Sequence, residues 1–269
     1  MKITVFLGGG RITSALAAGL RRSGYGETIV VYDRNPEKLR ALRRESHVKP
    51  ARDVKSAVAR AELLVFAVRP ASMAGILREV SECGVAPRVC VSLAAGIPLK
   101  NLHAWMPAGW VRAMPSPVCR TGRGLTALCF DRRISKEERR LVWKFFARVG
   151  QVVEVPEAQF DAFTATYSSS HGYHALAALA KAAQGEGLDS KTALTAAAHA
   201  LADGIRYWRE SGLSLDALLT EAATPGGIAA TTMAAMHRAG YSQSVEKGVQ
   251  AGVRLARRNA HTPRRGAKP

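Results

Sequence analysis

The chain has 269 residues, of which 47% are apolar and 22% are charged, and these proportions are typical of a folded globular protein. Its length suits one large domain or two smaller ones. No run of about 18 apolar residues is present that could span a bilayer. The apolar run at residues 3–7 is too short for a secretory leader. We therefore expect a cytoplasmic protein.

The net charge of +18 is large, and it is concentrated toward the C-terminus. A basic surface attracts nucleic acid or anionic lipid, and it equally attracts a small anion such as a dinucleotide. No aromatic residues are interleaved with the basic ones, as nucleic-acid-binding motifs require, so a nucleic-acid partner is not favoured. Residues 259–269 are predicted to form a solvated basic tail. After Glu246 the charged residues are all basic: Lys247, Arg254, Arg257, Arg258, Arg264, Arg265 and Lys268.

The four cysteines are Cys83, Cys90, Cys119 and Cys129, and no two of them form a C-x-x-C pair. Cys90 and Cys129 lie in apolar, strand-like runs, so we interpret them as reduced thiols of the core. No group of His, Cys, Asp and Glu residues has the spacing of metal ligands. No metal is therefore expected.

Short β-rich runs alternate with helical patterns through the first half of the chain. Ile12, Leu16 and Leu20 recur at helical spacing, and Pro36 suits the first turn of a helix. Strands that alternate with helices indicate βαβ units and hence a parallel sheet covered on both faces. We expect an α/β domain at residues 1–156. The predicted strands are residues 2–7, 28–32, 63–68, 88–92, 110–114, 125–130 and 152–155.

After about Pro156 the strand patterns stop and alanine dominates. Breaks that combine helix-stop and N-cap residues occur at residues 187–190, 211–214 and 224–227. The second half is therefore predicted to be an all-α domain at residues 157–258, with helices at 158–185, 190–211, 214–222, 226–239 and 242–258.

A glycine-rich segment follows the first predicted strand and opens the first helix. Gly8 would make the tight turn, and Gly10 would let a pyrophosphate approach the backbone. The N–H groups at the start of the helix, at Arg11 and Ile12, would face that anion. Asp33 ends the second strand about 20 residues beyond the motif, where dinucleotide-binding domains place an acidic residue. The sequence therefore predicts a dinucleotide site.

The end of the second strand bears on which dinucleotide binds. Asp33 would accept a hydrogen bond from a ribose 2′-hydroxyl, which favours NAD, whereas Arg34 would receive a 2′-phosphate, which favours NADP. A structural alternative is that Asp33 or Arg34 only caps the helix that begins at Pro36. We favour NADP, with NAD as the alternative.

Several segments together resemble the pyrroline-5-carboxylate reductase family, and their order fits that family from residue 1 to about residue 258. The Ser-Leu-Ala-Ala-Gly and Arg-Ala-Met-Pro segments are fairly specific, whereas many dehydrogenases share the glycine loop. The matching segments are residues 6–10, 33–39, 67–70, 91–96, 111–115, 167–173 and 224–227.

The resemblance implies an N-terminal Rossmann domain and a C-terminal helical domain that dimerises. The reaction it implies is transfer of a hydride from NAD(P)H to the C=N bond of 1-pyrroline-5-carboxylate, which gives proline. Met114 and Pro115 would then lie beside the nicotinamide. Other cofactor-binding positions would be Ala67, Val68, Arg69, Pro70, Ala94 and Gly96. The substrate carboxylate would meet Ser168, Ser169 and Ser170, together with Gly226 and Gly227 of the partner subunit.

The chain departs from the family pattern near the substrate. An expected Asn is Ser116, and the usual Ser-Gly-Ser-(Gly/Ser)-Pro-Ala-Tyr is replaced at residues 167–173 by Tyr-Ser-Ser-Ser-His-Gly-Tyr. A Thr expected near the imine nitrogen is absent, because Ile228 and Ala229 stand there. The serine run also has a structural interpretation, as a break in an alanine-rich helix.

Three hypotheses follow from these departures. The chain could still make proline through a proton relay at Thr231 or Thr232. It could reduce another cyclic imine, with His171 or Tyr173 as the proton donor. It could also have kept the fold and lost catalysis. From a different class, a nucleotide-sensing or nucleic-acid-binding Rossmann protein would explain the basic charge. A hydroxyacid dehydrogenase is disfavoured, because no Lys-x-x-Asn pair follows the predicted sheet.

Overall fold

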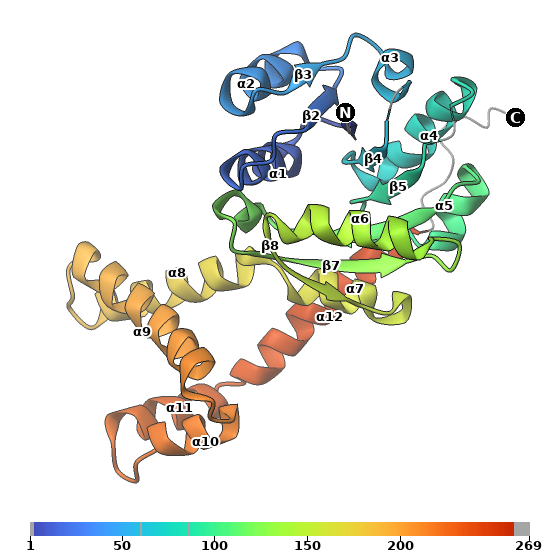
Figure 1. Cartoon of the computed structure of the whole chain (residues 1–269). Helices are drawn as coiled ribbons and strands as arrows, with labels where there is room; N and C mark the ends of the chain where they lie inside the picture. Colours follow the sequence, from blue (N-terminus) through green and yellow to red (C-terminus); the bar gives the residue numbers. More distant parts are fainter. Residues whose placement is uncertain (1–2, 60, 86, 261–269) are drawn as a thin grey trace, which may run out of the picture. The chain divides into compact units, whose positions relative to one another are not determined.

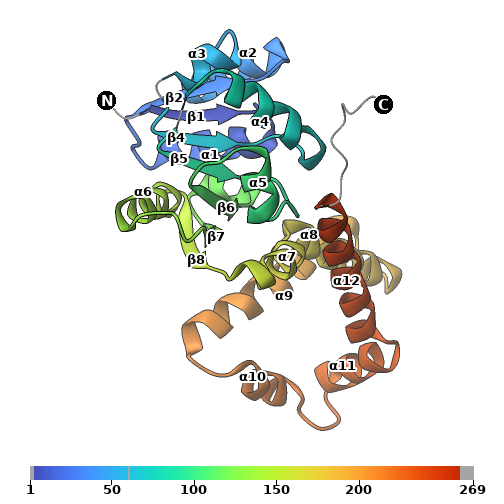
Figure 2. The same cartoon turned by 90° about the vertical axis from the view of Figure 1, so that its right-hand side faces the viewer.

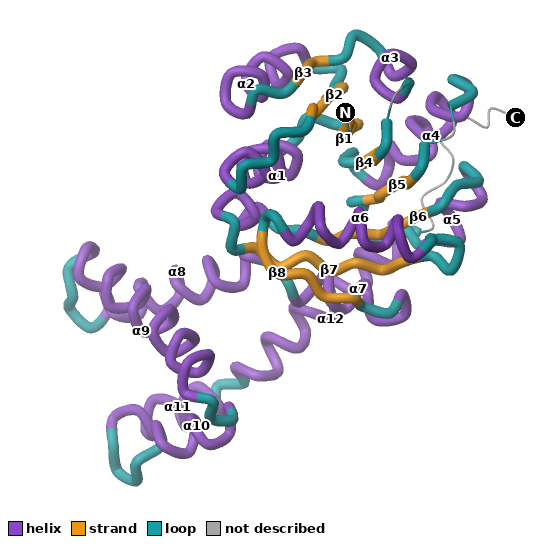
Figure 3. Tube along the Cα trace, in the orientation of Figure 1, coloured by secondary structure: helices purple, strands orange, loops and turns teal. Residues whose placement is uncertain are grey.

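The computed structural model describes residues 3–59, 61–85 and 87–260. Contacts divide the chain into two compact units. The first unit runs to Tyr167 and takes up the chain again at Ala251, and the second is Ser168–Gln250. The strands described all belong to the first unit, whereas the second contains only helices and loops (Figure 3). This division differs from the predicted boundary at residues 156 and 157, because the first helix after that boundary packs on the sheet.

The first unit is built on one eight-stranded sheet with the order β3-β2-β1-β4-β5-β6-β7-β8. Figure 2 shows β2, β1, β4 and β5 side by side. The seven predicted strands are confirmed, and the two-residue strand β3 was not predicted. The strands are β1 (Ile3–Leu7), β2 (Thr28–Tyr32), β3 (Lys49–Pro50), β4 (Leu63–Phe66), β5 (Val89–Ser92), β6 (Trp110–Met114), β7 (Gly124–Phe130) and β8 (Gly150–Glu154).

The expectation of a parallel sheet is wrong at one pairing, because β6 and β7 run antiparallel. Only the short 3₁₀ helix η2 (Pro117–Thr121) separates these two strands. A parallel pair needs a crossover of a dozen or more residues, so this connection can only turn the chain back. The next connection contains helix α6 (Lys136–Ala147) and is long enough for a crossover, and β8 accordingly lies parallel to β7.

Helices cover both faces of this sheet, as predicted. The side chains of β1 alternate between two cores: Phe6 packs with Leu16 of α1, whereas Val5 and Leu7 pack with Leu77 of α4. Helices α1, α2 and α6 contribute to the first core and α3, α4 and α5 to the second. The remaining bounds are α1 (Arg11–Arg22), α2 (Pro36–Ser46), α3 (Val54–Val58), η1 (Pro70–Ser72), α4 (Met73–Glu82), α5 (Leu99–Trp105) and α7 (Glu157–Thr166).

Helices alone make up the second unit, coloured yellow to orange in Figure 1. The helix predicted at residues 158–185 is wrong as a single element, since it is divided into α7 and α8. Tyr167 leaves the helical conformation, and the side chain of Ser168 caps α8 by accepting from the N–H of Ser170. Serine at this point therefore ends one helix and starts the next. The helices are α8 (Ser169–Gly185), α9 (Ser190–Ser211), α10 (Leu215–Ala222), α11 (Ile228–Arg238) and α12 (Tyr241–Asn259).

From Ala251 onward α12 belongs to the first unit, and its end is fixed there by hydrogen bonds. The side-chain amide of Asn259 donates to the carbonyl of Ala95 at 3.1 Å, and that of Asn101 donates to the carbonyl of Ala260 at 2.7 Å. The predicted tail therefore does not begin at residue 259. Residues 261–269, where the rest of that prediction falls, lie outside the described residues.

The cysteines of the sheet are buried thiols, as predicted. Cys90 of β5 is fully buried, and burial raises its pKa to about 12. Burial likewise raises the pKa of Cys129 in β7 to about 11. Within the described ranges, no helix is both long and apolar enough to cross a membrane.

Candidate active site

The turn after β1 requires glycine at its first position. Gly8 has a φ of +111°, and a Cβ added there would lie 2.6 Å from the carbonyl oxygen of Ala67, which follows β4. The hydroxyl of Thr13 donates to the Gly8 carbonyl at 2.6 Å, so this buried residue of α1 ties the helix to the turn. The strand and the helix are thereby held close together, as a dinucleotide-binding turn requires.

The start of α1 is open toward solvent and has no side-chain cap. Gly10 is its N-cap residue, and a Cβ added there would meet nothing within 4 Å. The first N–H groups of an α-helix have no partner within the helix and carry partial positive charge. Arg11 and Ile12 begin this helix, and Arg11 is exposed. The residues present therefore fit a diphosphate at this position.

The side chain of Asp33 is turned back toward this loop. Its Oδ2 accepts from the N–H of Gly9 at 2.7 Å, and its Oδ1 accepts from the N–H of Asn35 at 2.8 Å. Burial opposes ionisation, but these two donors and the Lys38 ammonium, 3.6 Å away, hold the pKa of Asp33 below its ordinary value. Asp33 therefore stabilises the loop as a carboxylate. Arg34 is exposed.

Neither Asp33 nor Arg34 caps α2, although the sequence left that alternative open. The cap is Asn35, whose side-chain oxygen accepts from the N–H groups of Glu37 and Lys38, and Pro36 occupies the first turn as predicted. Asp33 is thus engaged by the glycine loop and by Asn35 rather than by α2, whereas Arg34 is exposed.

The other predicted cofactor residues follow neighbouring strands of the same sheet. Ala67, Val68, Arg69 and Pro70 follow β4, and Ala94 and Gly96 follow β5, while Met114 ends β6 and Pro115 follows it. Strands β1, β4, β5 and β6 are parallel, so these residues lie at one edge of the sheet, where open α/β sheets bind their ligands.

Gly96 has a structural role that the sequence did not indicate. It has a φ of +78°, and a Cβ added there would lie 1.9 Å from the carbonyl oxygen of Ala256 in α12. Only glycine allows this loop to approach the helix so closely. The loop between Ala94 and Gly96 therefore packs against the last turn of α12.

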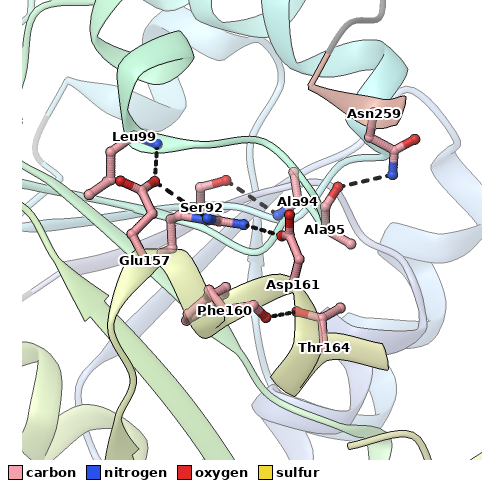
Figure 4. Close-up of polar contacts among 10 residues, drawn as sticks. Ser92, Ala94, Ala95, Leu99, Glu157, Phe160, Asp161, Thr164 and Asn259 are labelled. Atoms are coloured by element: carbon pink, nitrogen blue, oxygen red, sulfur yellow. Dashed lines mark hydrogen bonds and ion pairs between the residues drawn. The ribbon is translucent and has the colours of Figure 1, made fainter. Parts of the chain in front are cut away.

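An ion-pair network around the buried Arg112, not predicted from the sequence, joins the sheet to α7. The guanidinium of Arg112 in β6 lies 3.4 Å from Glu157 and 3.1 Å from Asp161, both of α7. Figure 4 shows these two carboxylates side by side on α7. Glu157 also accepts from the N–H of Leu99 at 2.6 Å, and the guanidinium lies 4.4 Å from the ring centre of Phe160. Arg112 thereby joins β6, α5 and α7.

The predicted substrate-binding residues belong to the second unit and lie at the starts of two helices. Ser168 caps α8, and Ser169 and Ser170 form its first turn. Gly227 is the N-cap of α11 and, like Gly10, provides no side-chain cap, while Gly226 has a φ of +74°. The start of α11 therefore has the features that suit a carboxylate.

The candidate proton donors lie on the same two helices. His171 and Tyr173 are in the first two turns of α8, and both are exposed. Thr231 is in α11, and its hydroxyl donates to the Gly227 carbonyl at 3.0 Å. Thr232 similarly donates to the carbonyl of Ile228 at 2.9 Å. No cluster of three or more His, Cys, Asp or Glu that could hold a metal occurs among the residues described.

Comparison with known families matches both halves of the chain. Residues 2–96 match the family model described as NADP oxidoreductase, coenzyme F420-dependent. Residues 157–259 match the model described as pyrroline-5-carboxylate reductase dimerisation. The two matched regions correspond to the α/β and helical parts of the fold, and together they agree with the predicted fold class.

Similar proteins cover nearly the whole chain. The pyrroline-5-carboxylate reductase of Haemophilus influenzae is 30% identical over 93% of this chain and 94% of that protein. A solved structure of the Plasmodium falciparum pyrroline carboxylate reductase with NADP bound has a TM-score of 0.87 at 18% identity, over 97% of this chain and 98% of that one. The Coxiella burnetii pyrroline-5-carboxylate reductase has a TM-score of 0.85 at 24% identity, over 96% and 98%. These structures show the same fold.

The pyrroline-5-carboxylate reductase of Mycobacterium tuberculosis strain H37Rv is 32% identical over 91% of this chain and 92% of its own length. Such identity extends over both units, well beyond the glycine loop that many dehydrogenases share. The chain belongs to the pyrroline-5-carboxylate reductase family.

Proposed function

We propose that the protein reduces the C=N bond of 1-pyrroline-5-carboxylate to give proline, with a reduced nicotinamide cofactor as the hydride donor. The observation that carries this proposal is that the uncapped glycine start of α1 lies at the same sheet edge as Met114 and Pro115, in a chain that also has the family's helical region. The cofactor supplies the hydride. The chain's own residues bind and orient the reactants and exclude water.

The glycine loop would hold the cofactor's diphosphate. The N–H groups at the start of α1 donate to the anion, and the open space at Gly10 lets it approach the backbone. Residues 67–70, Ala94 and Gly96 would line the cofactor along the same edge. Met114 and Pro115 would lie beside the nicotinamide.

We propose NADP rather than NAD as the cofactor. Both carboxylate oxygens of Asp33 already accept backbone N–H groups, so this side chain is less suited to bind a ribose 2′-hydroxyl. The exposed Arg34 offers a guanidinium that can bind a 2′-phosphate in bidentate fashion. A relative of this fold, the Plasmodium falciparum enzyme, has been solved with NADP bound.

Two arginine variants, each measured with NADPH and with NADH, test the cofactor proposal. Arg34→Ala should lower kcat/KM with NADPH by about tenfold or more, the value of one charge-assisted contact, and leave kcat/KM with NADH nearly unchanged. Arg40→Ala is the control, because Arg40 is an exposed arginine of α2, which begins two residues after Arg34, and it pairs with Glu37 at 2.6 Å. An equal loss with both cofactors in Arg34→Ala would contradict the proposal.

The substrate carboxylate would bind at the helix starts of the second unit. Ser168, Ser169 and Ser170 offer hydroxyls, and the uncapped N–H groups after Gly227 offer donors without a buried charge. In the proposed homodimer, these glycines come from the other copy of the chain. The large exposed apolar side chains of the second unit, such as Leu215 at 58% exposure, support such an interface.

His171, Tyr173 and Thr231 are the proposed candidates for the proton that the imine nitrogen needs. The hydroxyl hydrogen of Thr231 is already donated to Gly227, so Thr231 would have to break that hydrogen bond to transfer a proton. The variants His171→Asn, Tyr173→Phe and Thr231→Val separate them, since loss of the donor lowers kcat by about a hundredfold or more.

Oxidation of NADPH with 1-pyrroline-5-carboxylate tests the proposed function directly. We expect turnover with this substrate and much less with a six-membered cyclic imine or with a pyrroline that lacks the carboxylate. Turnover only with those alternatives would assign a different imine. NADPH binding without reduction of any imine would identify a chain that has kept the fold and lost catalysis.

A further inference from the structure

Two hydroxyl groups from distant parts of the first unit meet at the corner after β6. The phenol oxygen of Tyr167 lies 3.1 Å from Ser116 Oγ and accepts a 2.7 Å hydrogen bond from the N–H of Leu125. Ser116 Oγ also accepts from the N–H of Val118 at 3.3 Å. The two hydroxyls therefore tie the residue that follows α7 to the corner between β6 and β7.

One hydrogen of this hydroxyl pair has no acceptor among the residues that the structure describes. Two hydroxyls carry two hydrogens, and their mutual bond uses one of them, whichever group donates it. The remaining contacts of Ser116 and Tyr167 come from N–H donors, which offer nothing to accept the second hydrogen. Ser116 is only 5% exposed. The second hydrogen lies on the nearly buried Ser116 when Tyr167 donates within the pair, and on the partly buried Tyr167 when Ser116 does. On Ser116, a hydroxyl hydrogen without an acceptor is costly, so an acceptor on a ligand would complete the pair.

The position of the pair indicates which ligand this is. Ser116 directly follows Met114 and Pro115, at the sheet edge that carries the glycine loop. The predicted substrate-binding residues belong instead to the second unit. We propose that Ser116 and Tyr167 act as one positioning pair, which donates its remaining hydrogen to the carboxamide oxygen of the nicotinamide. This inference rests on the proposed placement of the nicotinamide beside Met114 and Pro115.

Two departures from the family pattern meet in this hydrogen bond. The pattern has Asn where this chain has Ser116, and Ser where it has Tyr167. Ser116 is shorter than the Asn it replaces, and Tyr167 is longer than the Ser it replaces. The corner therefore keeps its polar atoms, but more of them come from the residue that follows α7. The two substitutions therefore form one unit, and each should be poorly tolerated without the other.

Binding measurements on the full chain test the pair. Ser116→Ala and Tyr167→Phe should each raise the dissociation constant of NADPH by about tenfold, the value of one hydrogen bond to a ligand. The double variant should be no weaker than either single variant, because either change removes the donated hydrogen or its orientation. Adenosine 2′,5′-bisphosphate lacks the nicotinamide, so its dissociation constant should stay unchanged in all three variants.

Tyr25→Phe is the matched control. The Tyr25 hydroxyl also pairs with a hydroxyl, that of Thr4 at 2.8 Å, but near the start of β1 and hence at the opposite sheet edge. This variant should lose stability without any change in NADPH affinity.

Three results would overturn the proposal that Ser116 and Tyr167 together donate a hydrogen bond to the nicotinamide. NADPH affinities within about twofold of the unmodified chain would show that no bond to the nicotinamide is lost. A loss of about a hundredfold in the double variant would show two independent contacts. Equal weakening of NADPH and adenosine 2′,5′-bisphosphate would show a general structural effect. These readouts need no turnover, so a chain that binds NADPH but reduces no imine would refute the proposed function and leave this test intact.

As a further check, Ser116→Asn and Tyr167→Ser each restore one residue of the family pattern. Each alone should weaken NADPH binding, and the two together should recover most of the loss. A double variant as weak as the worse single one would contradict the interpretation that the two substitutions are coupled.

Discussion

Gly8 and Gly10 are two residues apart, but they are glycine for different reasons. Gly8 needs a positive φ and a close approach to Ala67, so the fold itself requires it. Gly10 has a φ of −78°, which any residue can adopt, and its missing side chain leaves open space. The sequence predicted both positions but could not separate the structural glycine from the binding one.

Alanine substitution separates these two roles. Gly8→Ala should lower the free energy of unfolding by about 1–3 kcal/mol or more, because it adds strain and a clash. Gly10→Ala should change it by less than about 1 kcal/mol yet weaken NADPH binding by about tenfold or more. Urea unfolding and titration with NADPH measure the two effects. Similar stability losses in both variants would contradict this division.

The lowered pKa of Asp33 predicts a pH-dependent contribution to stability. Since the folded state holds this carboxyl group ionised, its contribution is present above the unfolded pKa of about 3.9 and is lost as the pH falls through the lower folded value. Asp33→Asn should therefore be less stable than the unmodified chain at pH 7, and the difference should shrink below about pH 4. Urea unfolding at several pH values measures it, and a constant difference would refute the role.

At the scale of elements, α7 lies beyond the predicted boundary at residues 156 and 157 but packs on the sheet of the first unit. Its position after the last predicted strand suggested the start of the helical half. Arg112, Glu157 and Asp161 instead bind it to the sheet. A signal was present, because Arg112 is a charged residue between apolar ones in a strand, and the two carboxylates are four residues apart on one helix face. Only the folded structure shows that Arg112 of β6 meets the two carboxylates of α7.

Removing the buried Arg112 should be more costly than removing the cation of an exposed pair. Arg112→Met leaves two carboxylates, 39% and 23% exposed, without their cation and should lower the free energy of unfolding by more than the loss of a surface pair does. Arg139→Met is the control, because Arg139 pairs with Glu154 at 2.6 Å and lies over the ring of Phe130, but both partners are exposed. Arg139→Met should lower the free energy of unfolding by about 1 kcal/mol or less.

Equal losses in Arg112→Met and Arg139→Met would contradict the role assigned to burial. Adding Glu157→Gln and Asp161→Asn to Arg112→Met should recover much of the stability, since the uncompensated charges are then gone.

For the whole molecule, patterns local in sequence predicted the order of elements, and contacts between distant residues decided the rest. The strands and the glycine loop are encoded by nearby residues, so they were predictable. The antiparallel direction of β7 depends on the length of the connection before it. The break at Tyr167 depends on a hydrogen bond from the N–H of Leu125, 42 residues away in the sequence, to the Tyr167 hydroxyl. Periodicity carries no information on such contacts, and the roles of the substrate-binding residues remain predictions.

The second unit leaves large apolar side chains exposed, which predicts association through it. Ile205→Asp, on α9 and 53% exposed, should shift the protein from the proposed dimer toward a single chain of 28.8 kDa. Trp143→Asp is the control, because Trp143 is an exposed apolar side chain on α6 of the first unit and should leave the mass unchanged. Sedimentation measures both, and an unaffected dimer in Ile205→Asp would exclude α9 from the interface.

The packing of Gly96 against Ala256 also has a consequence for protein synthesis. The loop after β5 is translated well before the helix that it rests on, since Asn259 lies 164 residues beyond Ala95, whose carbonyl it holds. Domains generally fold as units during synthesis, yet this edge of the sheet stays incomplete until α12 has also been made. A stalled nascent chain that ends before residue 250 should therefore form the sheet and still fail to bind NADPH.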